Sequence, residues 1–458
     1  MKFSRAQFHA RVYRLPQLRF EDQRLTSFSG LVLLQALLRK LGVRQRLQRC
    51  FLHLAKGMVV GLPAITMLLI VHLMLGYRRL SELDYYREDP LVARSLGLRR
   101  LPHLSTVSRA LARVDRRAVA NLRELNRTLV LDRIQQERLA RVTLDFDGSV
   151  ISSRKHAEGL AVGYNVKRKG LRSYYPLFCC VAQTAQVLDV LHRSGNVHDS
   201  RGAGPFMQGC IAGVRQRVAT AVVESRVDSA FFSDEITTLL DQQNVQFTMS
   251  VPFERFPQLK RMIEARQRWR RLDADWDYFE VYWAPESWPV VDRVLILRHR
   301  VPLLQREPLQ LDLFRPSQRG YEFKTVLTNK SGSARRILLF HNGRSSQENG
   351  FSELKGQSQM NYVPTKRLAG NQLYLLCALQ AHNLYRELQM TVRSADRNTT
   401  ARRASLWIFR EAATIRQLLI HRAGRLTRPE GKLRLTLSGN EATRKEYLEH
   451  LRALQNTA

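Results

Sequence analysis

Residues 141–151, RVTLDFDGSVI, alternate apolar with polar or acidic side chains and are rich in β-branched residues, as is typical of a β-strand. Asp145 and Asp147 are two positions apart, so both point to the same face of the predicted strand. Carboxylates are the ligands that hard divalent cations prefer. Such a pair is common, and it equally suits the solvated end of a strand. The segment therefore predicts a strand that carries a candidate metal ligand, either Asp145 or Asp147.

The residues that follow predict a mixed α/β arrangement. KGLRSYYPLFCCVAQTAQVLDVLHRSG (169–195) contains two strand candidates joined as a hairpin, and residues 198–217 are typical of a helix. RVATAVVESRVDSAFF (217–232) then predicts a strand that ends at a second acid, Asp228.

A third acid lies in HNGRSSQENGFSELKGQ (341–357). Arg344, Glu348 and Lys355 have three and then six residues between them, so on a helix they share one sector. A carboxylate flanked by two cations is suited to bind metal while its neighbours hold DNA phosphates. Taken singly, an Arg or Lys on a helix is usually a solvated charge.

Three strands, a helix, a fourth strand that ends in an acid and a later acid on a helix form the order of a ribonuclease H-like fold. Acids in this order suit phosphodiester cleavage, which uses two divalent cations about 3.5–4 Å apart to activate the attacking oxygen and stabilise the leaving one. The sequence therefore predicts an α/β fold with a ribonuclease H-like catalytic domain at residues 139–370.

The long interval between Asp228 and Glu348 implies a β-rich insertion at about residues 240–335. Segments 278–282, 290–301 and 321–329 are predicted strands, and four tryptophans lie close together in this region. Core packing is the commoner use of such a tryptophan.

Residues 1–138 predict a helical DNA-binding domain, with helices at 25–41, 43–55, 58–76, 91–96 and 105–114. The last two resemble a helix-turn-helix, in which Ser108, Arg109 and Arg113 face one side. This side would either contact DNA or remain a solvated basic face. Residues 371–458 predict a closing helix and a helical C-terminal region, including a helix at 401–421 and a short strand in KLRLTLSG (432–439).

The net charge of +34, from 74 Lys and Arg against 40 Asp and Glu, predicts a nucleic-acid partner that neutralises the self-repulsion. The five cysteines form no zinc or disulfide pattern, which favours a reducing cytoplasm. Residues 58–76, MVVGLPAITMLLIVHLMLG, are long enough to cross a bilayer, but Gly61, Pro63 and His72 interrupt them. We interpret them as a buried helix, with a membrane span as the alternative.

The chain resembles the DDE transposases of bacterial insertion sequences, in the group with a Tyr, Arg, Glu, Lys signature. The resemblance covers almost the whole chain and is carried by LDFDGS, GYNVKRKGLRSYYPL, SGNVHDS, SRVDSAFF and the run from Arg344 to Lys355. AGNQLYLLCALQAHNLYREL (369–388) resembles the helix that closes the catalytic domain. His341 occupies the signature Tyr position, which is a departure from the pattern.

This resemblance implies that Asp147, Asp228 and Glu348 are the catalytic acids and hold two Mg²⁺ or Mn²⁺ ions. Asp147 is favoured over Asp145 because Gly148 and Ser149 follow it, although Asp145 remains a candidate ligand.

The resemblance also implies that Arg344 and Lys355 contact DNA phosphates, with His341 positioning the same strand. In related transposases an aromatic side chain of the insertion stacks on a flipped base. The candidates for this role in the present chain are Trp283 and Trp288.

The expected function is cut-and-paste transposition of double-stranded DNA, both transposon ends and target, by a homodimer in the bacterial cytoplasm, associated with the nucleoid and not with a membrane. Two alternatives stay open. One is a catalytically inactive relative that binds DNA ends, and the other is a ribonuclease H-like nuclease that cleaves without joining.

Overall fold

The computed structural model describes residues 4–5, 15–54, 60–163, 165, 168–198, 200–300, 320–397 and 405–455, without the side chains of residues 345–349 and 351. Within these residues a nine-stranded mixed sheet has the order β6-β5-β2-β7-β8-β12-β11-β10-β9. Its strands are β2 (Arg141–Gly148), β5 (Leu177–Val181), β6 (Gln186–Leu191), β7 (Val222–Val227), β8 (Gln246–Ser250), β9 (Arg270–Arg271), β10 (Trp276–Trp283), β11 (Asp292–Arg300) and β12 (Tyr321–Thr328).

The first half of the sheet has the predicted chain order. β2, β5 and β6 pair antiparallel, α8 (Ala203–Arg217) follows, and β7 returns parallel to β2. β8 then pairs parallel to β7. Alternation along β2 sends Leu144 and Phe146 into the core that α8 and α9 (Asp234–Gln242) help to form, so Asp145 and Asp147 face the opposite side. The predicted mixed α/β fold is confirmed.

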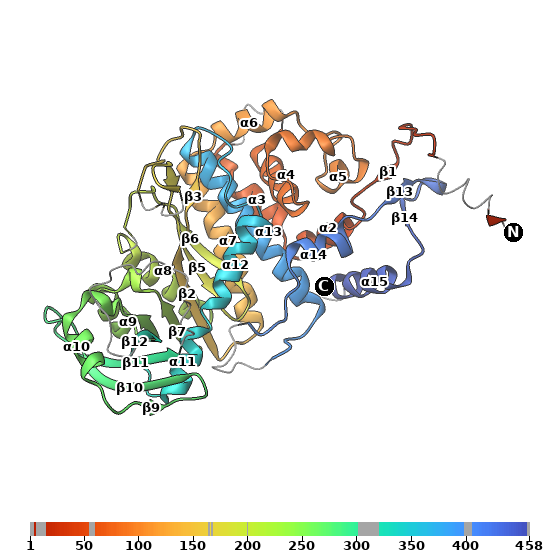
Figure 1. Cartoon of the computed structure of the whole chain (residues 1–458). Coiled ribbons are helices and arrows are strands. Elements are labelled where there is room, and N and C mark those ends of the chain that lie inside the picture. Colours follow the sequence, from red (N-terminus) through yellow and green to blue (C-terminus); the bar gives the residue numbers. More distant parts are fainter. Residues whose placement is uncertain are drawn as a thin grey trace.

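The strands of the predicted insertion lie within two residues of the expected positions. β12 pairs antiparallel with β8, and β11, β10 and β9 follow outward, so these strands extend the main sheet instead of forming a sheet of their own. Figure 1 shows them in green and cyan at the lower left, continuous with the rest of the sheet.

Helices dominate the N-terminal third (Figure 1). They are α2 (Leu31–Lys40), α3 (Val43–Cys50), α4 (Leu62–Met74), α5 (Pro90–Ser95), α6 (Leu104–Ala112) and α7 (Arg116–Gln136). The prediction that the first helix begins at Leu25 is wrong. Leu25 and Thr26 form β1, which pairs with β13 (Gly424–Thr427), and the Thr26 hydroxyl donates to the Asp89 carboxylate at 2.8 Å. The two ends of the chain therefore share a small sheet.

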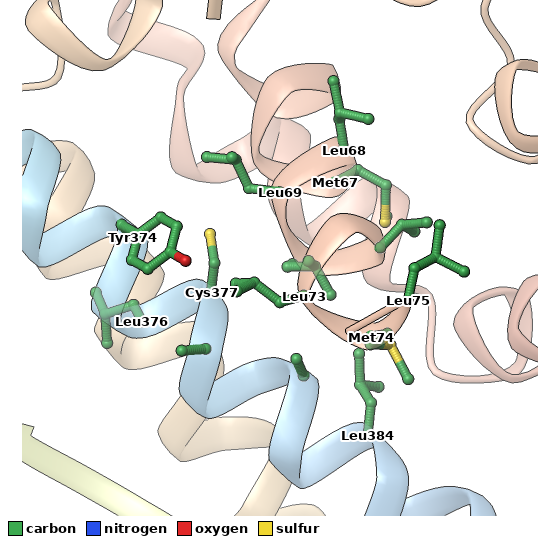
Figure 2. Close-up of a cluster of buried hydrophobic side chains, with 14 of the residues drawn as sticks. Met67, Leu68, Leu69, Leu73, Met74, Leu75, Tyr374, Leu376, Cys377 and Leu384 are labelled. Carbon is green, nitrogen blue, oxygen red and sulfur yellow. The ribbon is translucent and has the colours of Figure 1, made fainter. Parts of the chain in front are cut away.

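α4 is apolar on all sides and is buried on all sides, as expected for a core helix. It packs against α13 (Leu368–Val392), the predicted closing helix, and Figure 2 shows Leu73 of α4 beside Cys377 of α13. Burying each such leucine contributes about 1.5–3 kcal/mol. Among the described helices, none is both long and apolar enough to cross a membrane. α13 also contacts α7 and β6, so it joins the N-terminal helices to the sheet.

The predicted helix at residues 401–421 is shorter in the structure. Residues 401–404 lie outside the described range, and the helical part consists of α14 (Ala412–Ile415) and a π-turn at Arg416–Ile420. β14 (Arg434–Leu437) confirms the predicted short strand. The remaining elements are β3 (Ile151–Ser152), β4 (Ser173–Tyr174), α10 (Pro257–Ala265), α11 (Ala334–Asn342), α12 (Ser345–Gly356), α15 (Glu441–Gln455) and short 3₁₀ turns at Leu52–Leu54, Leu80–Tyr85, Ser229–Phe231, Phe253–Arg255 and Pro429–Gly431.

Candidate active site

Asp147 and Asp228 lie at the same edge of the sheet. Asp147 is near the carboxyl end of β2, and Asp228 follows the last residue of β7, the parallel neighbour of β2. The Asp228 carboxylate accepts a hydrogen bond from the Ser229 amide at 2.6 Å, which fixes the turn after the strand. Both side chains are partly exposed, 23% for Asp147 and 35% for Asp228, so an ion or a phosphate can reach them.

The guanidinium of Arg344 lies between these two acids. Its Nη2 atom is 2.8 Å from Oδ2 of Asp228 and 3.7 Å from Oδ1 of Asp147. Arg344 directly precedes α12, so the first turn of that helix is held at the edge of the sheet. Two carboxylates beside one guanidinium leave a net negative charge, which a divalent cation can compensate.

Asp145 has a different environment although it shares a face with Asp147. Its two carboxylate oxygens accept hydrogen bonds from Nε and Nη2 of Arg226 at 2.6 and 2.5 Å, and both side chains are almost fully buried. Nη1 of Arg226 also donates to the Phe340 carbonyl of α11 at 3.2 Å. The pair therefore connects the strand of the first acid to the helix that leads into Arg344.

His341, the residue at the signature Tyr position, belongs to α11, and its side chain is buried. One ring nitrogen lies 3.0 Å from the Thr248 hydroxyl and the other 3.0 Å from the Ser250 hydroxyl, both on β8. Burial, together with the charges of Lys324, Arg344 and Arg226, holds the His341 pKa well below 6.5. The neutral ring thus attaches α11 to the sheet.

The backbone of Glu348 lies in α12, one helical turn beyond Arg344, as the sequence predicted. Its side chain is outside the described part of the structure. Lys355 lies in the last turn of the same helix and is partly buried. A further acid of α12, Glu353, forms a buried ion pair with Arg386 of α13 and accepts a hydrogen bond from the Ala412 amide at 2.9 Å. Sequence analysis missed this pair, which anchors α12 to the core.

Within the described residues no three His, Cys, Asp or Glu side chains are grouped as a metal site. Asp147 and Asp228 nevertheless offer the oxygen ligands that Mg²⁺ or Mn²⁺ requires, at an accessible edge and around a cation. Asp145 fits such an ion poorly, because both of its oxygens are bound to a buried arginine.

Ser108 and Arg109 lie on α6, well before Asp145 and Asp147 in the chain, and both side chains are exposed. Gly97, with φ of +69°, separates α5 from the segment that leads into α6, as expected for the predicted helix-turn-helix-like pair. Their contact with DNA stays a prediction.

Trp283 and Trp288 both pack within the protein. Trp283 is 5% exposed, and its indole nitrogen donates to the Gln258 side chain at 3.1 Å. Trp288 stacks on Phe232, with ring centroids 4.7 Å apart. In this arrangement both rings are used for core packing, the commoner of the two expected uses.

Gly343 is required by the Arg226 pair, and sequence analysis missed it. A Cβ atom at this position would lie 2.1 Å from Nη1 of Arg226, whose guanidinium is fixed by Asp145. We expect Gly343→Ala to displace α11 or Arg226 and to lower the free energy of unfolding by about 1–3 kcal/mol.

Urea unfolding measures the effect of Gly343→Ala. Gly356→Ala is the matched control, because a Cβ atom at Gly356 meets open space. Equal behaviour of the two variants would show that the close approach at Gly343 is not needed.

Comparison with known proteins adds the family. The family model described as "Transposase DDE domain group 1" matches residues 8–458. No curated protein matches the chain. Among solved structures, the chain is similar to the piggyBac transposase in a synaptic complex with hairpin DNA, with 12% identity, 78% of this chain and 74% of that chain covered, and a TM-score of 0.40. It is also similar to the Mos1 transposase in a paired-end complex with the left transposon end, with 10% identity, 37% and 57% covered, and a TM-score of 0.18. Because the family model spans nearly the entire chain, the protein belongs to the DDE-domain transposases.

Proposed function

We propose that this protein is an active insertion-sequence transposase that cuts DNA at transposon ends and joins the freed ends to a target. One observation carries the proposal: the Asp147 and Asp228 carboxylates both contact the Arg344 guanidinium. Arg344 directly precedes α12, the helix that contains Glu348. Carboxylates gathered at one place suit the two divalent cations that stabilise the attacking and leaving oxygens in phosphodiester cleavage.

The strand order supports a ribonuclease H-like catalytic domain. The part β6-β5-β2-β7-β8 has three antiparallel strands followed by two strands parallel to the first. The acids lie at the carboxyl ends of β2 and β7, the end of parallel strands at which ligands commonly bind in open α/β sheets.

Asp147, Asp228 and Glu348 would hold the divalent cations. When bound, Mg²⁺ or Mn²⁺ ions would activate the attacking oxygen and stabilise the leaving oxygen. Arg344 offsets part of the negative charge of the two aspartates, and once cations are bound its guanidinium would be released to contact a DNA phosphate. Lys355 would contact a second phosphate further along α12. Asp145 and His341 would act by positioning β2 and α11 and not by contacting DNA.

Double-stranded DNA is the partner that the net charge of +34 favours, and the bacterial cytoplasm with its nucleoid is the corresponding location. The exposed Ser108 and Arg109 of α6 are proposed to contact the transposon end. Because two ends are cut and joined together, we infer a homodimer on DNA.

Cleavage and joining of labelled DNA that carries the element's flanking ends, with Mg²⁺ or Mn²⁺, tests the proposal. We expect Asp228→Ala to lower the cleavage rate at least about a thousandfold, since a metal ligand supplies several kcal/mol of transition-state stabilisation. Asp234→Ala is the matched control, because Asp234 is an equally partly buried aspartate six residues away, in the first turn of α9. Its rate should stay within about threefold.

The other readings give different results in the same assay. A protein that binds the ends but never cuts them is the inactive relative. A protein that cuts but never joins is a ribonuclease H-like nuclease. Either result overturns the proposal.

A further inference from the structure

A basic groove lies beside the small sheet that β1 forms with β13. Its volume is about 1090 Å³, at the upper end of the range of ligand pockets. The groove is bounded by α5, the segment after it, the residues before β1, and the turn between β13 and β14. In Figure 1, α5 and β13 are on the right of the molecule, away from β2 and β7, so the groove is separate from the candidate active site. Its charged lining residues are Arg24, Arg87, Glu88, Asp89, Arg94, Arg99, Arg100 and Arg428.

Strand pairing and hydrogen bonds hold the walls of the groove in place. β1 pairs with β13 in antiparallel register, which brings residues about 400 positions apart in the chain into contact. Asp89, which caps α5, binds this sheet through the Thr26 hydroxyl at 2.8 Å and the Ser27 amide at 3.1 Å. Its carboxylate also accepts from the Leu91 and Val92 amides. One of the two acids in the groove is therefore already occupied by structural hydrogen bonds.

Most of the arginines in the groove have no such occupation. Arg94, Arg99, Arg100 and Arg428 are exposed, and within the described residues their guanidiniums have no hydrogen-bond or ion-pair partner. Arg24 and Arg87 pair with the neighbouring acids Asp22 and Asp84. Four unpaired guanidiniums around one groove repel each other, and this cost is recovered when a polyanion binds.

Two features of the lining indicate the kind of polyanion. Single-stranded nucleic acids are held by stacking of bases on aromatic rings, and none of the described lining residues is aromatic. Arginine donates hydrogen bonds and accepts none, and its planar fork matches phosphate oxygens. The lining therefore suits a duplex backbone better than exposed bases.

We propose that this groove binds the phosphate backbone of duplex DNA without reading its sequence, as a second contact apart from the cleaved phosphate. The proposal rests on the proposed function in that the partner is the DNA on which the transposase acts. Such a contact holds the duplex in place while the scissile phosphate lies at the distant aspartates.

The test is the salt dependence of binding to a duplex of about 30 base pairs and arbitrary sequence. The groove variant combines Arg94→Ala, Arg99→Ala, Arg100→Ala and Arg428→Ala. The matched control combines Arg255→Ala, Arg261→Ala, Arg268→Ala and Arg270→Ala, which removes the same charge from exposed arginines around α10. A plot of log K against log salt has a negative slope. We expect the magnitude of this slope to decrease by about 2–4 for the groove variant and by less than about 1 for the control.

An unchanged slope for the groove variant, or an equal fall for the control, overturns the proposal. The proposal is also overturned if the groove variant loses more affinity for single-stranded DNA than for the duplex. Arg99→Glu alone, expected to lower the slope by about 1 or more, tests the groove with only one exposed side chain altered. Cleavage by the unaltered protein is measured beside binding. A groove variant that loses slope while the unaltered protein never cuts supports the groove and overturns only the proposed function.

Discussion

Asp147→Asn is expected to abolish DNA cleavage, by at least about a thousandfold, while the protein stays folded. The Asp147 carboxylate is partly exposed and lies 3.7 Å from Arg344, so its structural contribution is at most about 1 kcal/mol. Asparagine keeps the shape of the side chain but removes the charge that a divalent cation requires. The cleavage rate and the free energy of unfolding, measured on the same preparation, give both parts of the result.

Asp145→Asn should instead lower the free energy of unfolding strongly and affect catalysis itself little. It leaves the Arg226 charge buried without its partner, which costs about 3–5 kcal/mol of stability. Replacing the pair by apolar residues, Asp145→Leu with Arg226→Met, should recover most of this loss, because no unpaired charge remains buried. If Asp147→Asn still cuts DNA and a stably folded Asp145→Asn does not, Asp145 is the first catalytic acid and the assignment is reversed.

The sequence could not decide between these two aspartates because the answer depends on strand pairing. Asp145 is opposite Arg226 in the parallel register of β2 and β7, 81 residues away in the chain. Alternation within β2 places both acids on one face, but it does not show which of them meets a buried arginine.

The same argument explains what was predictable elsewhere. Local alternation located β2 and β7, and it located the three predicted strands of the insertion within about two residues, because adjacent positions carry the pattern of a half-buried strand. It gave no sign that β12 would pair with β8 and continue the main sheet. Likewise, β1 was predicted as helix, since its partner β13 lies about 400 residues away.

His341 and Gly343 show the limit for the site itself. The family resemblance implied that His341 would help to position a DNA strand, but the hydroxyls of Thr248 and Ser250 on β8 hold its ring inside the protein. Gly343 appears in the sequence as an ordinary helix-ending glycine, whereas its role depends on the approach of Arg226. Contacts between distant elements set both roles.

Acidification from pH 7 to pH 5 is expected to lower the free energy of unfolding by about 6 kcal/mol through three buried histidines. Burial lowers the pKa of His72 to about 4 and that of His382 to about 3, and it holds the His341 pKa well below 6.5. In the unfolded chain each of these pKa values returns to about 6.5. Below that pH the unfolded state binds protons that the folded state does not bind. Stability is therefore complete above pH 6.5 and is lost as the pH falls toward the folded values.

Urea unfolding at several pH values measures this loss, with an expected slope of about 4 kcal/mol per pH unit near pH 5, or about 1.4 for each histidine. His72→Gln removes one of the three, so its slope should fall by about a third even though the loss of the 2.7 Å contact to the Tyr86 hydroxyl lowers the stability at pH 7. The slope separates proton uptake from packing, because a lost contact shifts the curve at every pH and a lost histidine changes its steepness. A curve that is flat between pH 7 and pH 5 would mean that these rings are not held neutral by burial.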